Sequence, residues 1–142
     1  MFVLDTNVLS ALMRAPQTPA VAAWIRAQRF DQLYTTTISQ AEILAGLAIM
    51  PTGRRQEGLA ATAVAMFEED FFGRVLAFDS AAASAYADVV AGRRRAGRTT
   101  EGLDLMIAAV ARSRGAAVVT RDVGGFADCG VEVVNPWHAE KA

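Results

Sequence analysis

Phe2-Val3-Leu4-Asp5-Thr6-Asn7, at the start of a 142-residue chain, is the stretch around which the rest of the sequence is interpreted. Its three apolar residues predict a short buried strand, and an apolar pattern with helical spacing follows at once. Asp5 therefore stands at the carboxyl end of a strand, where open α/β sheets place their ligands. The same carboxylate could simply cap the following helix. These six residues alone leave both roles open.

The composition predicts one domain that spans residues 1–142. A chain of this length can bury a full core. Its hydrophobic content of 53% and mean hydropathy of +0.24 exclude disorder for most of it. The formal net charge of -1 argues against a protein that binds nucleic acid through its overall charge, although a local basic patch is compatible with it.

The cysteine count and the N-terminus bear on the compartment. Cys129 is the only cysteine, so the sequence holds neither a disulfide framework nor a cysteine-based zinc site. The N-terminus lacks the basic and apolar regions of a signal peptide. The apolar runs are too short, or too interrupted by charge, to span a bilayer. We therefore expect a cytoplasmic protein without a membrane partner.

Short apolar segments alternate with helical patterns along the chain. We expect strands at residues 2–4, 33–37, 75–78, 116–120 and 131–134, and helices at residues 8–14, 19–29, 39–50, 55–71, 81–95 and 103–114. This alternation predicts parallel strands with helices on both faces. The expected fold is a three-layer α/β/α sandwich with a central parallel sheet of about five short strands.

Two further aspartates, Asp79 and Asp122, follow predicted strands as Asp5 does. Asp79 could be a helix cap or part of a site, and its surroundings do not separate the two. If the strand order is 3-2-1-4-5, the first and fourth strands are neighbours at the switch point of a doubly wound sheet. This assumed order brings Asp5 and Asp122 together and leaves Asp79 at an edge.

Asp104 and Glu42 lie on predicted helices. Asp104 is in the first turn of a helix that is apolar on almost every side, which is typical of a buried helix. A carboxylate there is costly unless it is paired, hydrogen-bonded or metal-bound, although the helix dipole eases the cost. Glu42 follows Ser39 by three residues, a spacing that predicts a capping box. Glu42 could instead face a metal, but it cannot easily do both.

Carboxylates gathered in one cleft repel each other, and their pKa values rise. Hard cations such as Mg²⁺ or Mn²⁺ relieve this repulsion, because they prefer oxygen ligands. A metal bound by carboxylates can activate water and stabilise charge on a phosphate oxygen. Such a site needs neither His nor Cys. The only histidine, His138, is expected to be a solvated residue of the C-terminal segment.

Four motifs, taken in order, resemble the PIN-domain family, and most closely the VapC and FitB toxins of bacterial type II toxin–antitoxin pairs. They are Leu4-Asp5-Thr6-Asn7-Val8-Leu9-Ser10, Ile38-Ser39-Gln40-Ala41-Glu42-Ile43, Asp104-Leu105-Met106-Ile107-Ala108-Ala109 and Thr120-Arg121-Asp122. Asn135-Pro136-Trp137 and Pro51-Thr52-Gly53-Arg54-Arg55 add to a likeness that covers essentially the whole chain. Each motif is weak alone, but four in this order and spacing are fairly specific.

The resemblance implies a PIN-like fold and a metal-dependent endoribonuclease, the toxin of a type II pair, which cleaves RNA phosphodiester bonds with metal-activated water. The catalytic residues that it implies are Asp5, Glu42, Asp104 and Asp122. Three of them, Asp5, Asp104 and Asp122, would hold Mg²⁺ or Mn²⁺. Asn7 and Thr120 match polar positions that support this site in relatives.

The resemblance also implies a homodimer that is silenced by a VapB- or FitA-like antitoxin, through which the pair binds operator DNA. One position departs from the family. Many relatives carry another Asp directly before the Phe that follows the fourth acidic position, whereas Gly125 precedes Phe126 here. We therefore expect a leaner metal site, with one ion or two left open.

Other hypotheses remain at this stage. A non-enzymatic subunit of a DNA-bound toxin–antitoxin repressor is one, and the intact carboxylates argue against it. Receiver domains need a buried lysine, but the only lysine is Lys141, and aspartate-nucleophile phosphatases need an aspartate where Asn7 stands. The basic cluster of Arg93, Arg94, Arg95 and Arg98 is either a solvated helix end, which we favour, or a contact for RNA phosphates.

Overall fold

The computed structural model describes residues 1–14 and 16–138. In this part of the chain, five short parallel strands form one sheet in the order β3-β2-β1-β4-β5. They are β1 (Phe2–Leu4), β2 (Leu33–Thr36), β3 (Val75–Leu76), β4 (Ala117–Val119) and β5 (Val133–Val134). The assumed order is confirmed, and β1 pairs with β4 in the register Phe2↔Ala117 to Leu4↔Val119.

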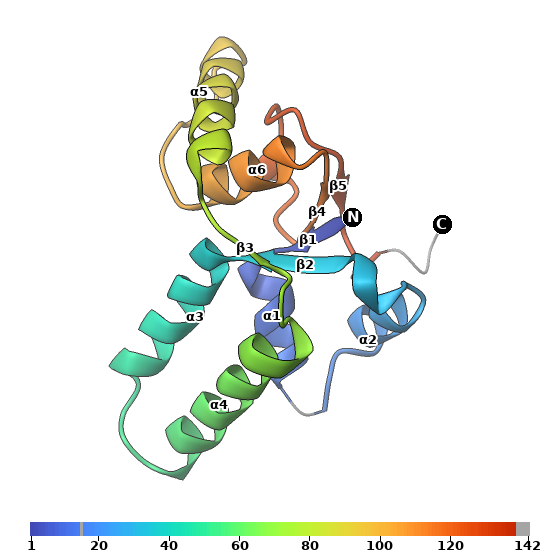
Figure 1. Ribbon diagram of the computed structural model, residues 1–142, viewed down its shortest axis with the longest axis vertical. Coiled ribbons are helices and arrows are strands. Elements are labelled where there is room, and N and C mark those ends of the chain that lie inside the picture. The colour runs from blue at the N-terminus through green and yellow to red at the C-terminus, as the bar shows by residue number, and fades with distance from the viewer. Residues whose placement is uncertain (15, 139–142) are drawn as a thin grey trace.

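Helices cover both faces of the sheet (Figure 1). On one face lie α5 (Ser80–Arg95) and α6 (Asp104–Ser113). On the other face lie α1 (Thr6–Met13), α2 (Pro19–Arg26), α3 (Thr37–Ile49) and α4 (Arg54–Ala65). The predicted three-layer α/β/α sandwich is therefore confirmed.

The strands divide the core into two parts, because successive side chains of a strand point to opposite faces. Val3 and Val118 pack with the residues of α5 and α6. Leu4 and Val119 pack with those of α1 and α4. As predicted, α6 is buried on almost every side, with Leu105 1% exposed and residues 107–111 fully buried.

Two helices, α1 and α3, begin two residues earlier than predicted, and a capping side chain explains each. Asp5 caps α1, since its Oδ1 accepts a hydrogen bond of 2.7 Å from the backbone N–H of Thr6. Thr36 caps α3, since its Oγ1 accepts a hydrogen bond of 3.1 Å from Ser39 N–H. Ser39 therefore lies inside the helix. The capping-box interpretation of Ser39 and Glu42 is wrong, and Glu42 is free to face another partner.

Other elements differ from the prediction in extent. The predicted helix at 55–71 is α4 followed by a π-helical segment, Met66–Asp70, and the predicted strand at 75–78 contains only Val75–Leu76. Asp79 is the cap of α5, because its Oδ1 accepts a 2.9 Å hydrogen bond from Ala82 N–H. It follows the edge strand β3, so it lies apart from β1 and β4 as expected.

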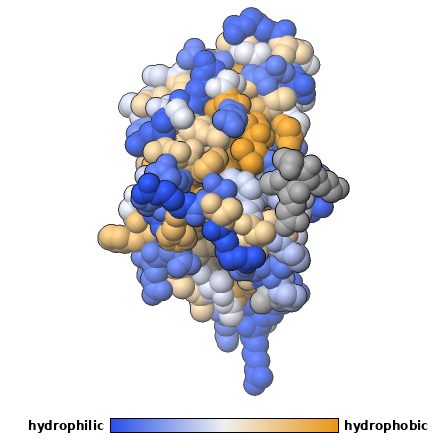
Figure 2. Space-filling model, turned by 90° about the vertical axis from the view of Figure 1, so that its right-hand side faces the viewer, coloured by the Kyte–Doolittle hydropathy of each residue, from blue (hydrophilic) through white to orange (hydrophobic). Residues whose placement is uncertain are grey.

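The surface in Figure 2 carries hydrophilic side chains over most of the visible face, with a smaller hydrophobic area among them. Within the described residues, none of the helices combines the length and the apolar character that crossing a membrane requires.

Replacing Thr36 with Val should lower the free energy of unfolding by about 1–2 kcal/mol, because the isosteric side chain cannot accept the Ser39 hydrogen bond in this buried position. Urea denaturation at pH 7 measures the change. Thr62→Ala, at an exposed position of α4, is the control and should change stability by less than about 0.5 kcal/mol. Equal stability of the two variants would contradict the assignment of the cap.

Candidate active site

Asp5 is a buried carboxylate, only 3% exposed, at the carboxyl end of β1. While one of its oxygens caps α1, Oδ2 accepts hydrogen bonds from Thr120 Oγ1 at 2.7 Å and from Asn7 Nδ2 at 3.2 Å. Its backbone N–H donates to Val119 O at 2.9 Å. Asp5 therefore caps a helix, which is one of the two roles considered from the sequence, and it is also held at the junction of β1 and β4.

Asn7 and Thr120 join this junction to the segment that follows β4. Asn7 Nδ2 also donates to Thr120 Oγ1 at 3.2 Å, and Asn7 Oδ1 accepts from Arg121 N–H at 3.2 Å. Thr120 Oγ1 accepts a further hydrogen bond, of 3.0 Å, from Asp122 N–H. The Thr120 hydroxyl therefore links Asp5 to the backbone of Asp122.

Glu42 reaches the same region from the first half of α3. Its Oε1 accepts a 2.9 Å hydrogen bond from Thr6 Oγ1, and the Thr6 hydroxyl also lies 2.9 Å from Ser39 Oγ. Thr6 adjoins Asp5 in the chain, so this contact ties α3 to the end of β1. No specific pattern in the sequence predicted this contact of Thr6 with Ser39 and Glu42.

Asp104 and Asp122 approach each other beside Gly125. Gly125 N–H donates to Asp122 Oδ1 at 3.1 Å. A Cβ atom on Gly125 would lie 2.6 Å from Asp122 Oδ2 and 2.8 Å from Asp104 Oδ2, closer than real Cβ contacts. The absence of a side chain at position 125 therefore lets this loop close over both carboxylates.

The acidic side chains perturb one another. Burial raises the pKa of the Asp5 carboxyl, and the charges of Glu42 and Asp122 raise it further, whereas hydrogen bonds from Thr120 and Thr6 lower it. Burial also raises the pKa of Asp104, to about 6, with smaller contributions from Asp5 and Asp122 and an opposing one from Arg93. Keeping the carboxylates of Asp5 and Asp104 ionised at this site therefore costs free energy.

All four predicted catalytic residues, Asp5, Glu42, Asp104 and Asp122, line one pocket of about 480 Å³. Within residues 1–14 and 16–138, no group of three or more Asp, Glu, His or Cys side chains is arranged so that it could bind a metal ion by itself. Mg²⁺ is usually bound through one or two carboxylates together with water and substrate phosphates. The all-oxygen donors and their mutual repulsion fit a cation of that kind. His138 is exposed and is not among the residues that line this pocket.

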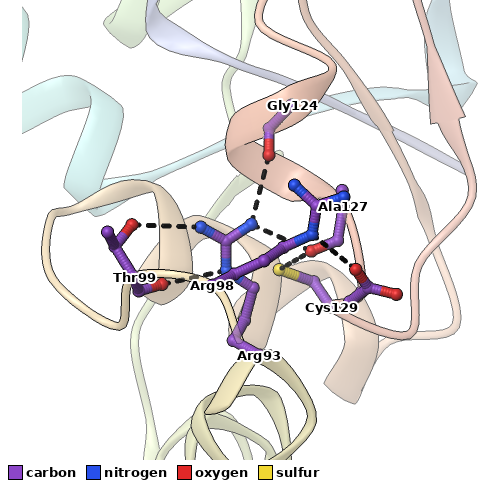
Figure 3. A network of polar contacts seen from close by, with 7 residues as sticks. Arg93, Arg98, Thr99, Gly124, Ala127 and Cys129 are labelled. Atoms are coloured by element: carbon purple, nitrogen blue, oxygen red, sulfur yellow. Dashed lines mark hydrogen bonds and ion pairs between the residues drawn. The ribbon is translucent and has the colours of Figure 1, made fainter. Parts of the chain in front are cut away.

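Arg93 anchors the loop that carries Asp122. This arginine on α5 is only 5% exposed. Its guanidinium donates to the backbone oxygens of Thr99 at 3.0 Å, Gly124 at 3.1 Å and Ala127 at 3.0 Å, as Figure 3 shows. Its positive charge also opposes the rise in the pKa of Asp104. Arg93 therefore belongs to the interior beneath the site.

The other members of the predicted basic cluster lie outside the acidic pocket. Arg98 forms a 2.5 Å ion pair with Asp128, and Arg94 and Arg95 are exposed. The basic side chains that line the pocket are instead Arg14 and Arg121, together with Trp137. The sequence offered a signal for Arg121, which directly precedes Asp122, but Arg14 and Trp137 come into the pocket only through the fold.

Comparison with known proteins places this geometry in context. The sequence profile of the PIN domain family matches residues 2–130. The chain is 43% identical to plasmid stability protein StbB of Pseudomonas syringae pv. tomato, covering 98% of this chain and 100% of that protein. It is 42% identical to VapC ribonuclease Y4jK of Sinorhizobium fredii, covering 97% and 99%. The structure of FitAB bound to an IR36 DNA fragment contains a similar chain, with a TM-score of 0.86, 33% identity and coverage of 97% and 96%.

We predict that Asp104→Asn stabilises the metal-free protein at pH 7. The folded-state pKa of Asp104 is raised from 3.8 to about 6. Between pH 3.8 and about pH 6, the carboxyl of Asp104 is therefore mostly protonated in the folded chain and mostly ionised in the unfolded chain. The wild type therefore loses stability as pH rises from about 4 to about 6. At pH 7 the variant should be more stable by about 1–2 kcal/mol after allowance for solvent screening.

Urea denaturation in chelator, at pH 4 and pH 7, measures this difference. The two proteins should be closer in stability at pH 4, where the carboxyl is protonated in the folded state and only partly ionised in the unfolded state. An identical pH profile for the wild type and Asp104→Asn would contradict a raised pKa of Asp104 in the folded protein.

A second prediction concerns the anchored loop. Arg93→Met should lower the free energy of unfolding by about 2–4 kcal/mol, because the backbone oxygens that Arg93 binds lose their buried donor. Exchange of the Gly125 amide hydrogen should also become faster. Arg94→Met, one residue along the same helix but exposed, should change stability by less than about 0.5 kcal/mol. Unchanged Gly125 exchange in Arg93→Met would show that this anchor does not hold the loop.

Proposed function

The chain belongs to the PIN-domain family, within its VapC and FitB toxin branch, and on this premise we propose that it is a divalent-metal-dependent endoribonuclease. The observation that carries the proposal is the meeting of four carboxylates from β1, α3, α6 and the end of β4 in one pocket. VapC ribonuclease Y4jK, the relative that is 42% identical, bears the name of this activity. The substrate that we propose is RNA, and the reaction is hydrolysis of its phosphodiester bonds.

Each carboxylate has a proposed role. Asp5, Asp104 and Asp122 hold Mg²⁺ or Mn²⁺, and Glu42 is the fourth catalytic carboxylate. PIN-domain ribonucleases in general depend on divalent metals. When bound, such an ion supplies positive charge for the scissile phosphate and lowers the pKa of water. The hydrogen bonds from Thr120 and Asn7 orient Asp5, and the Gly125 N–H orients Asp122, before any substrate arrives.

The premise extends to the biological setting. We propose that residues 1–142 form a single PIN domain, the cytoplasmic toxin of a type II pair, which is active as a homodimer. Its partner would be a VapB- or FitA-like antitoxin, and the pair would bind operator DNA through that antitoxin. The structure of FitAB on a DNA fragment, which contains a chain similar to this one, supports both partners.

A second candidate function is a non-enzymatic subunit of such a DNA-bound repressor, and the same DNA-bound relative favours it. The two candidates differ in what the carboxylates do. A repressor subunit needs no ionised, metal-binding acids, whereas a nuclease does. Four carboxylates line one pocket, and burial, with smaller contributions from neighbouring acids, raises the pKa of Asp5 and Asp104, so the chain keeps these acids together at a cost, which supports the nuclease.

Purified protein free of antitoxin should cleave RNA when Mg²⁺ or Mn²⁺ is present, and chelator should abolish the cleavage. Asp5→Asn and Asp122→Asn should each lower the rate by about 100-fold or more, since a charged ligand contributes several kcal/mol to transition-state stabilisation. Asp88→Asn, at an exposed position of α5, is the matched control and should keep full activity. Rates on a labelled RNA, with thermal unfolding of each variant, provide the measurement.

Two outcomes would decide against the nuclease. Folded wild-type protein that cleaves no RNA with either ion, while its complex with the antitoxin binds operator DNA, would establish the repressor subunit instead. Cleavage that persists unchanged in Asp5→Asn and Asp122→Asn would place the active site elsewhere in the molecule.

A further inference from the structure

We propose that Arg14, Arg121 and Trp137 form a binding site for one nucleotide of single-stranded RNA at the wall of the acidic pocket. This inference rests on the proposed function and extends it to the groups that hold the substrate. In the proposed arrangement the base stacks against the paired side chains of Arg121 and Trp137. The adjoining phosphate is bound by the guanidinium groups of Arg14 and Arg121.

Electrostatics favours such a site. Four carboxylates line the pocket and repel an RNA phosphate, and cationic side chains at the same pocket offset this repulsion in addition to the proposed metal ion. Arg14 and Arg121 are the arginines that line it. Among the described residues neither forms an ion pair, whereas Arg29, Arg98 and Arg114 do. Their charges are therefore available to a ligand.

Arg121 and Trp137 form a preorganised stacking surface. The guanidinium carbon of Arg121 lies 5.2 Å from the centroid of the Trp137 ring. The backbone N–H of Arg121 is held by Asn7 Oδ1, which is part of the network around Asp5. A guanidinium plane and an indole ring are the two kinds of surface on which proteins stack unpaired bases. Their place in the same pocket as the carboxylates puts a stacked base next to the reacting phosphate.

The segment Asn135-Pro136-Trp137 fixes the position of the indole. The backbone N–H of Trp137 donates to Asn135 Oδ1 at 3.0 Å, and Pro136 is buried. The ring is only partly buried and packs against the core cluster below α1. Core packing accounts for the buried part of the ring. Its remaining surface borders the acidic pocket, where a base could stack on it.

Fluorescence provides a test that does not depend on cleavage. Trp24 is the only other tryptophan, so the variant Trp24→Phe, Asp122→Asn reports on Trp137 alone and should hydrolyse its ligand at least about 100-fold more slowly. In Mg²⁺, a single-stranded RNA of about ten nucleotides should quench this fluorescence. Adding Arg121→Ala should weaken the affinity about tenfold, and Arg14→Ala should reduce the dependence of affinity on salt by about one phosphate contact. Arg94→Ala, outside the pocket, should change neither.

The cleavage kinetics of the active protein provide a second test of the nucleotide site. Trp137→Ala and Arg121→Ala should raise KM about tenfold and leave kcat within about twofold, while Trp137→Phe should retain most of the affinity. Thermal unfolding shows whether each variant remains folded.

The inference is overturned if folded Arg121→Ala and Trp137→Ala bind RNA like the parent protein. It is also overturned if an acidic peptide, and not RNA, quenches Trp137. If either of these results is found while the wild type cleaves RNA, the nucleotide site is refuted and the proposed function stands. A wild type that binds RNA at Trp137 but cleaves none refutes the function and leaves the site.

Discussion

Burial of the Asp5 carboxylate is the constraint on which the rest of the site depends. A buried charge is tolerated only where hydrogen bonds or opposite charges compensate it. The backbone of Thr6 binds one oxygen, while Thr120 and Asn7 bind the other. These donors come from the ends of two neighbouring strands, so the contacts that satisfy Asp5 also fix how β1 meets β4. The carboxylate thus organises the fold at the point where the chemistry is proposed to occur.

Much of the fold can be predicted because its signals are local and periodic. Apolar runs mark the strands, and Asp104 is recognisable because a carboxylate has few structural explanations on a helix that is apolar all round. Strand order is different, since no spacing in the sequence states which strands pair. It must be assumed before Asp5 and Asp122 can be brought together, and only the pairing of β1 with β4 justifies that step.

Glu42 and Arg93 show what local patterns cannot reveal. Ser39 and Glu42 have the spacing of a capping box, but Thr36 stands at the junction of β2 and α3 and takes the role of the cap. Arg93 belongs to a run of three arginines that predicts a solvated helix end. Of these three arginines, only Arg93 is buried, and its guanidinium binds three backbone oxygens from two separate segments, the loop at Thr99 and the loop from Gly124 to Ala127. Both outcomes depend on tertiary contacts.

The close approach at Gly125 has a consequence for how the site can evolve. Any residue larger than glycine would bring a carbon atom within 2.8 Å of oxygens from both Asp104 and Asp122. An exchange to aspartate, the residue that the resemblance to the PIN-domain family implies for many relatives, would therefore require the two carboxylates to turn away or the loop to retreat. Such a retreat would strain the carbonyl contacts of Gly124 and Ala127 with Arg93. A fifth carboxylate at position 125 is therefore coupled either to movement of Asp104 and Asp122 or to the contacts that Arg93 makes with this loop.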